Sequence, residues 1–516
     1  MGKWMDGYLE KLEMKKLANL MGGGQERIDL QHSLGKLTAR ERIDRLVDPD
    51  TFDEIGALVT DSRQPLDDKL RPSPAEGVVM GFGKVDGRSA MIFSLDYTVM
   101  SGSLGDQAVW KLAELVEMAG ERRMPIIGMM DSAGERISIR NGNSGLNGLA
   151  RLIRNYCLYS GVVPRIMLLL GPCTGVLSSI PALSDFLIIN EETGFLWFGG
   201  EKKTEDAGNA EFHMEKSGQC DLIAENDEDA IDTAKKLLAF LPQNCWEKPA
   251  DIETGDDPKR REESLLDVMP DNPKFTYDIH DIIEKIVDNG EFFELKEDFA
   301  THLVIGFARF GGKVAGIAAN NPDEMSGVFE IDSSDKYDRF IMFLDAFNIP
   351  LINLVDSTAY VPGDKWERLG IIRHGAKNLL SYSHLTNQKI TIVLRRAYGG
   401  ANIVMGCARM NPDFIMGWPT GEFAPTGPEA IVQAVFHKEL DKAREKGKYE
   451  ETYDMFVSLI RDRMNVLNLS KDWTSYYMIQ KPLDPRDTRS AIITALEATS
   501  EKYEELPDKR RYIKPA

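Results

Sequence analysis

Uninterrupted apolar runs alternate with amphipathic stretches along the first half of the chain. Three such runs, at 125–131, 164–171 and 185–190, follow a strand-like segment at 91–96, and residues 106–122 have apolar side chains at helical spacing. Apolar runs of this length between helices are typical of parallel strands that are buried on both faces. The pattern therefore predicts an α/β unit in which strands and helices alternate.

The second half repeats this pattern. Apolar runs stand at 314–320, 350–356 and 389–395, and residues 333–348 are predicted to form the intervening helix. We expect Ser333 or the serine that follows it to be the N-cap, because a hydroxyl there accepts a hydrogen bond from a free N–H of the first turn. A second α/β unit of the same kind is therefore expected.

Matching residues recur at one sequence offset, which indicates a duplication. The segment MPIIGMMDS at 124–132 resembles IPLINLVDS at 349–357, which lies 225 positions later. Three further matches have the same offset: Met100–Gly102 with Met325–Gly327, Gly87 with Gly312, and Gly175 with Gly400. This clustering favours one fold used twice over two similar loops that arose by coincidence.

Polar and charged segments surround the two halves. Residues 246–264 are charged and poor in apolar side chains, so they are a credible linker between domains. The first 50 residues are charged and have helical character, and a further helix is expected at 488–505.

Composition limits the classes of function. With 516 residues the chain is too long for one ordinary core, so at least two domains are expected. A net charge of −20 argues against a nucleic-acid partner, since such proteins usually carry a basic face. The five cysteines lack CxxC spacing, which argues against a zinc site or a disulfide framework and favours a reducing, cytoplasmic setting.

Other general signals are missing from the sequence. The seven histidines show no metal-ligand spacing, so no bound metal is expected. The N-terminal residues have no apolar segment of the kind found in secretory signals. No run of 18 apolar residues occurs, so direct membrane insertion is not expected.

Small residues gather in the loops where four of the predicted strands end. These loops are DSAGERI (131–137), GPCTG (171–175), DSTAYVPG (356–363) and RAYGGA (396–401). Ligands of α/β units collect at the carboxyl ends of strands, and small residues let a ligand reach backbone N–H groups. Neither 131–137 nor 396–401 matches a triphosphate or dinucleotide motif, so those ligands are poorly supported.

Individual side chains give weaker indications of chemistry. His374 is a candidate base, but a lone histidine on a helix is more often structural. Ser132 and Ser357 are candidate nucleophiles, yet the sequence places no base beside either. Tyr398 either packs inside the protein or contacts substrate.

Backbone donors remain the best candidate chemistry. Two adjacent N–H groups that face a developing negative oxygen form an oxyanion hole, which suits a thioester being converted to an enolate. In RAYGGA the alternative is that the glycines only allow a tight strand-to-helix turn. Arg395 and Arg396 before the glycines either bind an acidic partner or solvate a strand end.

Several longer motifs resemble a known family. GKLTARERI (35–43), GIIRHGAK (370–377) and AYGGA (397–401) are specific signatures, and similarity extends over about residues 20–440. The chain resembles the carboxyltransferase β subunit of biotin-dependent acyl-CoA carboxylases, of the propionyl-CoA carboxylase type. The resemblance implies carboxyl transfer between carboxybiotin on a carrier protein and the α-carbon of an acyl-CoA.

The resemblance also implies the fold and the assembly. It implies an α/β protein of two tandem crotonase-like (ClpP/crotonase) domains, each a β-β-α superhelix. Residues 1–250 would form the N-terminal carboxyltransferase domain, which holds the acyl-CoA, and residues 251–516 the C-terminal domain, which holds biotin. Family members form hexamers, with each active site between the N half of one protomer and the C half of another.

By position, the resemblance assigns roles to backbone groups. Ala133 and Gly134 would supply the oxyanion hole for the thioester. Gly400 and Ala401, with Gly399 allowing close approach, would hold the ureido oxygen of biotin.

The resemblance assigns further binding residues. Lys36 and Arg40, with Arg42 beside them, stand where the family binds the nucleotide end of CoA; the alternative is that they are ordinary surface helix charges. Tyr398 and Gly175 are expected to contact the bound groups.

The resemblance implies partners as well. The cofactor would be biotin on a separate carrier protein, the CoA thioester would be the substrate, and this chain would bind no metal. The sequence has no biotinyl-lysine motif and no biotin carboxylase domain. A biotin carboxylase and a biotin carboxyl carrier subunit are therefore expected partners.

The chain departs from the family at the predicted substrate surfaces. Glu135 replaces a small residue, and its charge would disfavour a nearby enolate unless Arg136 pairs with it. Residues 356–370 add Tyr360 and Trp366 near the biotin side. Two other segments, 420–430 and 467–489, also differ from the usual pattern.

Two alternatives follow from these observations. The same chemistry run in reverse would serve the carboxyltransferase subunit of a biotin-dependent, sodium-pumping acyl-CoA decarboxylase. The departures at Glu135 and in the C half also permit a non-catalytic CoA-binding assembly subunit. The sequence specifies neither the acyl-CoA nor the direction of transfer.

Overall fold

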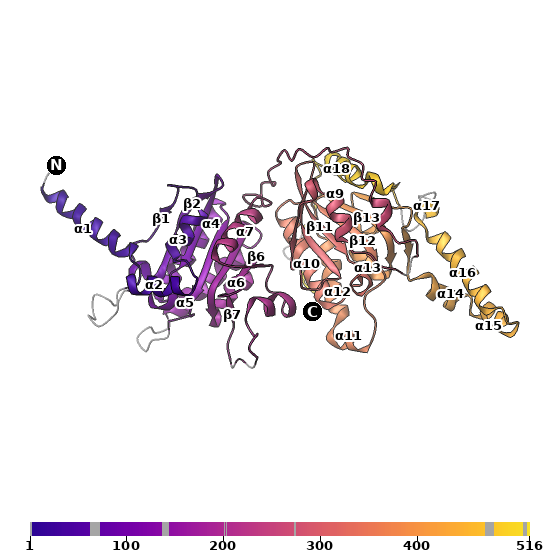
Figure 1. The fold of residues 1–516 in the computed structure, drawn as a ribbon, viewed down its shortest axis with the longest axis horizontal. Helices are drawn as coiled ribbons and strands as arrows, with labels where there is room; N and C mark the ends of the chain where they lie inside the picture. Colours follow the sequence, from indigo (N-terminus) through magenta and orange to yellow (C-terminus); the bar gives the residue numbers. More distant parts are fainter. Residues whose placement is uncertain are drawn as a thin grey trace. The chain divides into compact units, whose positions relative to one another are not determined.

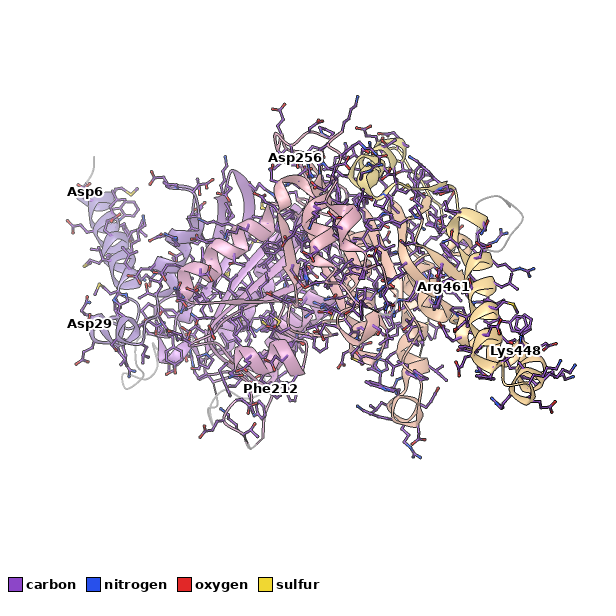
Figure 2. The ribbon with its side chains drawn as sticks, turned by 45° about the vertical axis from the view of Figure 1, so that its right-hand side comes forward. Asp6, Asp29, Phe212, Asp256, Lys448 and Arg461 are labelled. Atoms are coloured by element: carbon purple, nitrogen blue, oxygen red, sulfur yellow. The ribbon has the colours of Figure 1, made fainter. Side chains whose placement is uncertain are left out.

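The chain forms two compact units, Met1–Lys248 and Pro249–Ala516 (Figure 1). The computed structural model describes residues 3–61, 73–136, 144–200, 202, 204–272, 275–469, 479–508 and 513–515. Two parts of the sequence predictions, Ile137 and residues 470–478, lie outside the described residues. Side chains fill the space around the strands within each unit (Figure 2).

In the described part of the N-terminal unit, eight strands form one sheet in the order β1-β2-β3-β4-β5-β6-β8, with β7 paired to β5. The first three strands pair antiparallel, and the pairs from β3 to β8 are parallel. The strands are β1 Asp53–Glu54, β2 Val78–Val85, β3 Arg88–Leu95, β4 Ile126–Ser132, β5 Arg165–Thr174, β6 Phe186–Asn190, β7 Phe195–Trp197 and β8 Leu222–Ala224.

The helices of this unit follow the predicted periodicity. They are α1 Lys3–Leu20, α2 Gln25–Ser33, α3 Ala39–Leu46, α4 Asp106–Arg122, α5 Ser144–Leu158, α6 Ser179–Leu183 and α7 Asp227–Leu238, with a 3₁₀ turn, η4, at Gly175–Ser178. The predicted helix at 106–122 is confirmed as α4. Its apolar side chains pack with those of β4 and β5 in a buried core, because burial of apolar surface is the main force that holds such layers together.

In the described part of the C-terminal unit, the same architecture recurs in an eight-stranded sheet of order β16-β14-β13-β12-β11-β10-β9, with β15 paired to β13. Its strands are β9 Phe292–Leu295, β10 Leu303–Phe310, β11 Lys313–Asn320, β12 Leu351–Ser357, β13 Lys389–Tyr398, β14 Phe414–Gly417, β15 Glu422–Ala424 and β16 Lys481–Pro482. The predicted parallel strands β11, β12 and β13 are confirmed.

The helices of the C-terminal unit include a group that follows β15. They are α8 Leu265–Val268, α9 His280–Ile286, α10 Ile331–Ala346, α11 Asp364–Leu369, α12 Ile371–Tyr382, α13 Gly399–Val404, α14 Pro428–Val435, α15 His437–Glu445, α16 Tyr449–Met464, α17 Val466–Leu469 and α18 Thr488–Ala498. Helix α18 ends before the predicted residue 505.

The N-cap prediction for α10 needs correction. The cap is Glu330, whose side chain accepts from the Ser333 N–H at 2.8 Å, while the Ser333 hydroxyl accepts from the Glu330 N–H at 2.8 Å. Two orphan N–H groups are satisfied reciprocally, as in a capping box. The serine therefore acts from the third helical position, and the helix starts two residues earlier than predicted.

The duplication is confirmed in the strand register, with one correction. Ile126 pairs with Arg165 in the N half, and Leu351 pairs with Lys389 in the C half. The chain from β4 to β5 is thus one residue longer than the chain from β12 to β13. The offset is 225 up to β12 but 224 along β13, so Gly175 corresponds to Gly399 rather than Gly400.

Candidate active site

Strands β4 and β12 both end in a register shift that contains a buried aspartate. The pairing of β4 with β5 shifts between Met130 and Ser132, and that of β12 with β13 shifts at the equivalent place, between Val355 and Ser357. Asp131 and Asp356 lie within these shifts and are fully buried. A bulge bends the strand and redirects the chain, so each carboxylate lies where a strand leads into a candidate loop.

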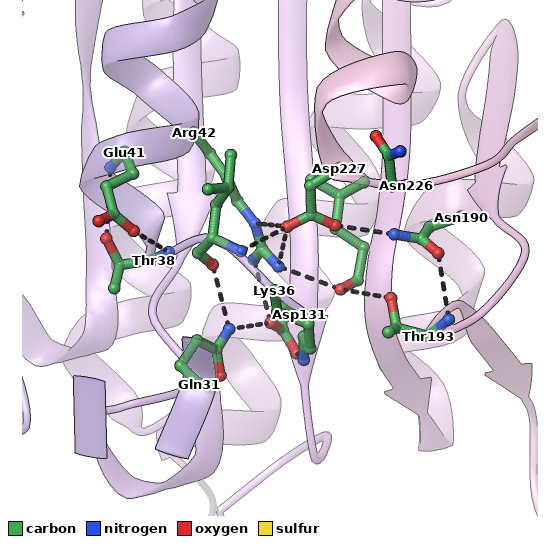
Figure 3. A network of polar contacts seen from close by, with 12 residues as sticks. Gln31, Lys36, Thr38, Glu41, Arg42, Asp131, Asn190, Thr193, Asn226 and Asp227 are labelled. Carbon is green, nitrogen blue, oxygen red and sulfur yellow. Dashed lines mark hydrogen bonds and ion pairs between the residues drawn. The ribbon is translucent and has the colours of Figure 1, made fainter. Parts of the chain in front are cut away.

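In the N half, cations from the segment around α2 and α3 neutralise Asp131 (Figure 3). Lys36 Nζ lies 2.7 Å from Asp131 Oδ1, and Arg42 bridges Asp131 at 3.0 Å and Asp227 at 2.8 Å. Gln31 donates a further hydrogen bond to Asp131. Lys36 and Arg42 are therefore interior residues, which removes the alternative that they are surface charges.

Arg40 lies in the same segment but has another partner. Its guanidinium donates to both carboxylate oxygens of Glu54, at 2.9 and 3.1 Å. Such bidentate pairs fix geometry as well as charge. The positive charges of Lys36 and Arg40 are thus matched within the N half, and their contact with CoA stays a prediction.

In the C half, the matching cations come from β13 itself. Arg395 Nε donates to Asp356 at 2.8 Å, and Arg396 donates through Nε at 2.6 Å and through its backbone N–H at 3.2 Å. In the N half, Gly171 stands at the register position of Arg395. A Cβ on Gly171 would lie 2.0 Å from Asp131 Oδ1 and 2.8 Å from Lys36 Nζ, so the bonded Asp131 and Lys36 side chains together take the space that a side chain would need there.

The turn from β13 into α13 presents free backbone donors. Tyr398 is the N-cap residue and makes no side-chain cap, so Gly400 and Ala401 stand in a first turn whose N–H groups have no intrahelical partner. Gly399 adopts φ 57°, in the left-handed region that favours glycine. The ring of Tyr360 lies beside this turn, 3.2 Å from where a Cβ on Gly400 would be.

The N half contains the same turn, but one of its donors is occupied. Gly175 has φ 72° and starts η4, so Val176 and Leu177 correspond to Gly400 and Ala401. The Leu177 N–H donates to Glu135 Oε1 at 3.1 Å. The chain's own carboxylate therefore fills the place that is open in the C half.

Glu135 and Tyr360 occupy equivalent positions in the two repeats. Glu135 forms an isolated bridge with Leu104, and Tyr360 forms the same bridge with Phe329, 225 residues later. Each side chain then lies against the glycine-led turn of its own half. This one position is negatively charged in the N half and neutral in the C half.

The predicted thioester donors Ala133 and Gly134 both have hydrogen-bond acceptors within the protein. The Ala133 N–H donates to Ser101 O at 3.0 Å, and the Gly134 N–H donates to Ser132 Oγ at 3.0 Å. Both donors are used to fold the loop, which leaves neither directed at a ligand. The donors equivalent to those of the C half are at Val176 and Leu177.

The expected partner of Glu135 also needs correction. Arg136 pairs with Glu76 at 2.6 Å and with Asp61 at 3.5 Å, and it donates to Ser103 O at 2.8 Å. The arginine turns toward these groups because two carboxylates and a carbonyl surround it. Glu135 is held by the Leu177 N–H instead.

The side-chain candidates have structural partners. His374 Nδ1 lies 2.9 Å from Asp335, which also binds Lys377 at 3.0 Å. The Ser132 hydroxyl donates to Gly102 O at 2.7 Å. The hydroxyl of Tyr398 donates to Glu422 inside the C half. These contacts favour structural roles for the three side chains.

A pair of buried lysines was missed by the sequence analysis. Lys111 donates to Ala75 O and Val78 O, and Lys336, 225 residues later, donates to the carbonyls of Lys296 and Phe299. Burial lowers the pKa of Lys111 to about 8 and that of Lys336 to about 7. The shared offset was the signal that could have revealed them.

Two general features concern only the part of the chain that the structure describes. Within it, no group of three or more His, Cys, Asp or Glu side chains is arranged to hold a metal ion. No helix there is both long and apolar enough to cross a membrane.

Residues 30–513 match the family described as carboxyl transferase domain. The chain belongs to this family. It is therefore a carboxyltransferase, and the enzyme class inferred from the sequence motifs is confirmed.

Curated relatives cover nearly the whole carboxyltransferase chain. The methylmalonyl-CoA carboxyltransferase 12S subunit of Propionibacterium freudenreichii subsp. shermanii is 39% identical and covers 98% of this chain and 97% of its own length. Methylmalonyl-CoA decarboxylase subunit alpha of Veillonella parvula is 38% identical, with coverages of 97% and 98%. The carboxyltransferase subunit of propionyl-CoA carboxylase from Haloferax mediterranei is 36% identical, with 98% coverage of both chains.

A solved structure has the same fold. The crystal structure of transcarboxylase 12S, a hexamer assembly with methylmalonyl-coenzyme A and methylmalonic acid bound, matches this chain with a TM-score of 0.94 at 37% identity. The match covers 100% of this chain and 99% of that one. The predicted crotonase-like fold is thereby confirmed.

Proposed function

We propose that this carboxyltransferase moves a carboxyl group between biotin on a separate carrier protein and the α-carbon of an acyl-CoA. The observation that carries the proposal is the pair of glycine-led turns, one per half, at the ends of β5 and β13. The reaction places negative charge on two oxygens, and the C-half turn offers two backbone donors to one of them, while the N-half turn offers the Val176 N–H to the other. The names of these relatives support the acyl-CoA reactant.

The C-half turn fits the biotin side. Carboxybiotin, when bound, would supply the carboxyl group, and negative charge would gather on its ureido oxygen as that group leaves. Gly400 and Ala401 offer uncapped N–H groups, and Gly399 keeps the entrance to the turn free of a side chain. Tyr360 forms a neutral wall beside them. Among the described residues, no carboxylate accepts a hydrogen bond from the Gly400 or Ala401 N–H, so both donors stay available to an anionic oxygen.

The N-half turn fits the thioester side. In place of Ala133 and Gly134, we assign the thioester oxygen to the η4 turn, where Val176 provides a donor and Gly175 allows close approach. Glu135 holds the Leu177 N–H in this structure. Lys36 and Arg40 are retained as candidates for the nucleotide end of CoA.

Orientation contributes the remaining acceleration. Two reactants held in reacting geometry gain a large entropic advantage over free collision. The proposal includes a hexamer in which the N half of one protomer meets the C half of another, together with separate biotin carboxylase and carrier subunits in the cytoplasm. The hexamer assembly of transcarboxylase 12S supports the hexamer in this proposal.

An acyl-CoA panel tests the proposal. The purified chain would be incubated with free biotin or a biotinylated carrier and with malonyl-, methylmalonyl- and other carboxylated acyl-CoAs. Loss of a carboxyl group that depends on biotin supports the proposal. Absence of turnover with every acyl-CoA and both forms of biotin would instead favour a non-catalytic CoA-binding subunit, for which Glu135 at the N-half turn is the motivating observation.

The decarboxylase subunit is a second candidate. It is favoured by the 38% identity to methylmalonyl-CoA decarboxylase subunit alpha across 97% of this chain. One active site serves both carboxylation and decarboxylation, so the partner subunits decide the direction of carboxyl transfer. Co-purification with an ATP-using biotin carboxylase would establish carboxylation, and co-purification with a membrane subunit that couples turnover to sodium would establish decarboxylation.

A further inference from the structure

A polar chain links the biotin-side turn to the helices that follow β15. The Tyr398 hydroxyl donates to Glu422 Oε2, and Arg461 Nε lies 3.0 Å from Glu422 Oε1. Tyr398 is the N-cap residue of α13, and Glu422 begins β15. Arg461, which Figure 2 labels, lies on α16. One carboxylate therefore joins three separate elements.

Burial and pairing hold this link in place. Tyr398 is 5% exposed and Glu422 is 9% exposed. Strand β15 pairs in parallel with the end of β13, where Arg396 is opposite Glu422 and Tyr398 is opposite Ala424. Burial raises the pKa of Glu422, while the bonds from Tyr398 and Arg461 oppose that rise. The two bonded partners thus favour the charged carboxylate.

Apolar contacts support the same connection. Tyr398 and Ala424 form a small buried cluster with Met464 at the end of α16. Ile431 of α14 and Ile460 of α16 pack against this cluster. The ring of Tyr398 is therefore clamped between the turn and the helices, and its hydroxyl is fixed by Glu422.

Among the described residues, the N half has no such link at the equivalent place. By the register of β5, Thr174 corresponds to Tyr398, and β7 corresponds to β15. The Thr174 hydroxyl donates to Ala133 O, within the same loop region. The link through Glu422 is thus a property of the half that is proposed to bind biotin.

We propose that Glu422 is a positioning residue for the biotin side of the reaction. It holds Tyr398, and through Tyr398 it fixes the first turn of α13, so that the Gly400 and Ala401 N–H groups keep the orientation needed for an anionic oxygen. Arg461 holds the carboxylate from the other side. This inference rests on the proposed function of the turn.

Steady-state kinetics of the full-length chain with free biotin would test it. Tyr398→Phe removes the donor and keeps the ring. It is expected to raise the KM for biotin about tenfold, because a hydrogen bond to a charged group is lost, while the KM for acyl-CoA stays within about twofold. Glu422→Gln keeps an acceptor for Tyr398 but weakens the bond to Arg461, so a smaller rise in the KM for biotin is expected.

Substitutions at Arg461 test the positioning role without changing the buried side chains of Tyr398 and Glu422. Arg461→Gln is expected to raise the KM for biotin about threefold, and Arg461→Lys, which keeps the charge beside Glu422, should recover most of that change. Tyr156→Phe, a fully buried tyrosine of the N half, is the matched control and should leave the KM for biotin unchanged.

The outcomes distinguish failure of this inference from failure of the proposed function on which it rests. Wild-type KM values for biotin in folded Tyr398→Phe and Glu422→Gln would overturn the positioning role while the wild-type enzyme still turns over. Equal changes in both KM values would also overturn it, because they would indicate general loosening. If Tyr398→Phe does not fold, the comparison of Arg461→Gln with Arg461→Lys decides whether the positioning role holds. Absence of biotin-dependent turnover in the wild type would remove the proposed function and the inference together.

Discussion

The two halves share a fold but differ in what fills their glycine-led turns. In the C half, Gly400 and Ala401 present uncapped N–H groups beside the neutral ring of Tyr360. In the N half, Glu135 stands at the position of Tyr360 and takes the Leu177 N–H. One repeat position therefore decides whether a turn is open to an external anion or is occupied by the protein's own carboxylate.

The halves also neutralise equivalent aspartates in different ways. Asp356 receives Arg395 and Arg396 from the neighbouring strand, whereas Asp131 receives Lys36 and Arg42 from outside the repeat. The two halves thus share the carboxylate at the strand end but pair it with different cations. The requirement is thus a neutralised charge at the bulge, and different cations meet it.

The largest expected effect concerns Asp356→Asn. This change leaves Arg395 and Arg396 buried without their shared carboxylate, and breaking such a pair costs about 3–5 kcal/mol in the free energy of unfolding. Asp131→Asn should cost less, because Arg42 keeps its bond to Asp227. Urea unfolding of both variants would measure the difference, and a larger loss for Asp131→Asn would contradict this comparison.

Removal of a donor from the open turn should affect catalysis. Ala401→Pro deletes one N–H in a first helical turn, where proline is tolerated. We expect a folded protein whose carboxyl transfer is slower by roughly 10²–10³. Ala401→Ser keeps the N–H and is the control, with activity close to wild type. Full activity of the proline variant in the same assay would remove Ala401 from the donor pair.

The two buried lysines, Lys111 and Lys336, should contribute differently to the pH dependence of the free energy of unfolding. Burial lowers the pKa of Lys336 to about 7 and that of Lys111 to about 8, while an unfolded lysine titrates near 10.4. Between the folded and unfolded values, the unfolded chain binds a proton that the folded chain lacks, so stability rises with pH across that window.

Lys336→Met and Lys111→Met would test this separation. Between pH 7 and 8 Lys336→Met should flatten the rise in stability more than Lys111→Met, by at most about 1.4 kcal/mol per pH unit. Above pH 8 both variants should flatten it. Chemical unfolding at several pH values measures the slopes, and identical slopes for both variants between pH 7 and 8 would contradict the assignment.

The smallest expected effect concerns Glu135→Gln. Removing a negative charge beside the N-half turn should favour an enolate there by about 1 kcal/mol, or roughly fivefold in kcat/KM for acyl-CoA. The KM for biotin should not change, since the other half holds biotin in this proposal. A tenfold loss of activity would instead identify Glu135 as a participant in the chemistry.

The sequence was sufficient for the layout of elements but not for the contacts that distinguish the halves. Apolar runs and helical spacing located α4 and the central strands, because those patterns reflect local geometry and burial. The one-residue change of offset after β12 was not visible, since register depends on how strands pair. That error linked Gly175 to Gly400 in place of Gly399.

The candidate site could be predicted only in part, and the reason is similar. Motifs located both strand-end loops and the glycine-led turns. They did not reveal that the Ala133 N–H donates to Ser101 O, or that Lys36 lies buried against Asp131. These contacts join residues that are far apart in the chain, and only the folded structure brings them together.

A crystal structure of the enzyme with biotin tests the central comparison most directly. The account predicts the ureido oxygen within hydrogen-bond distance of the Gly400 and Ala401 N–H groups, with Glu135 still bonded to the Leu177 N–H. Biotin bound at the Leu177 turn, or away from both turns, would contradict it.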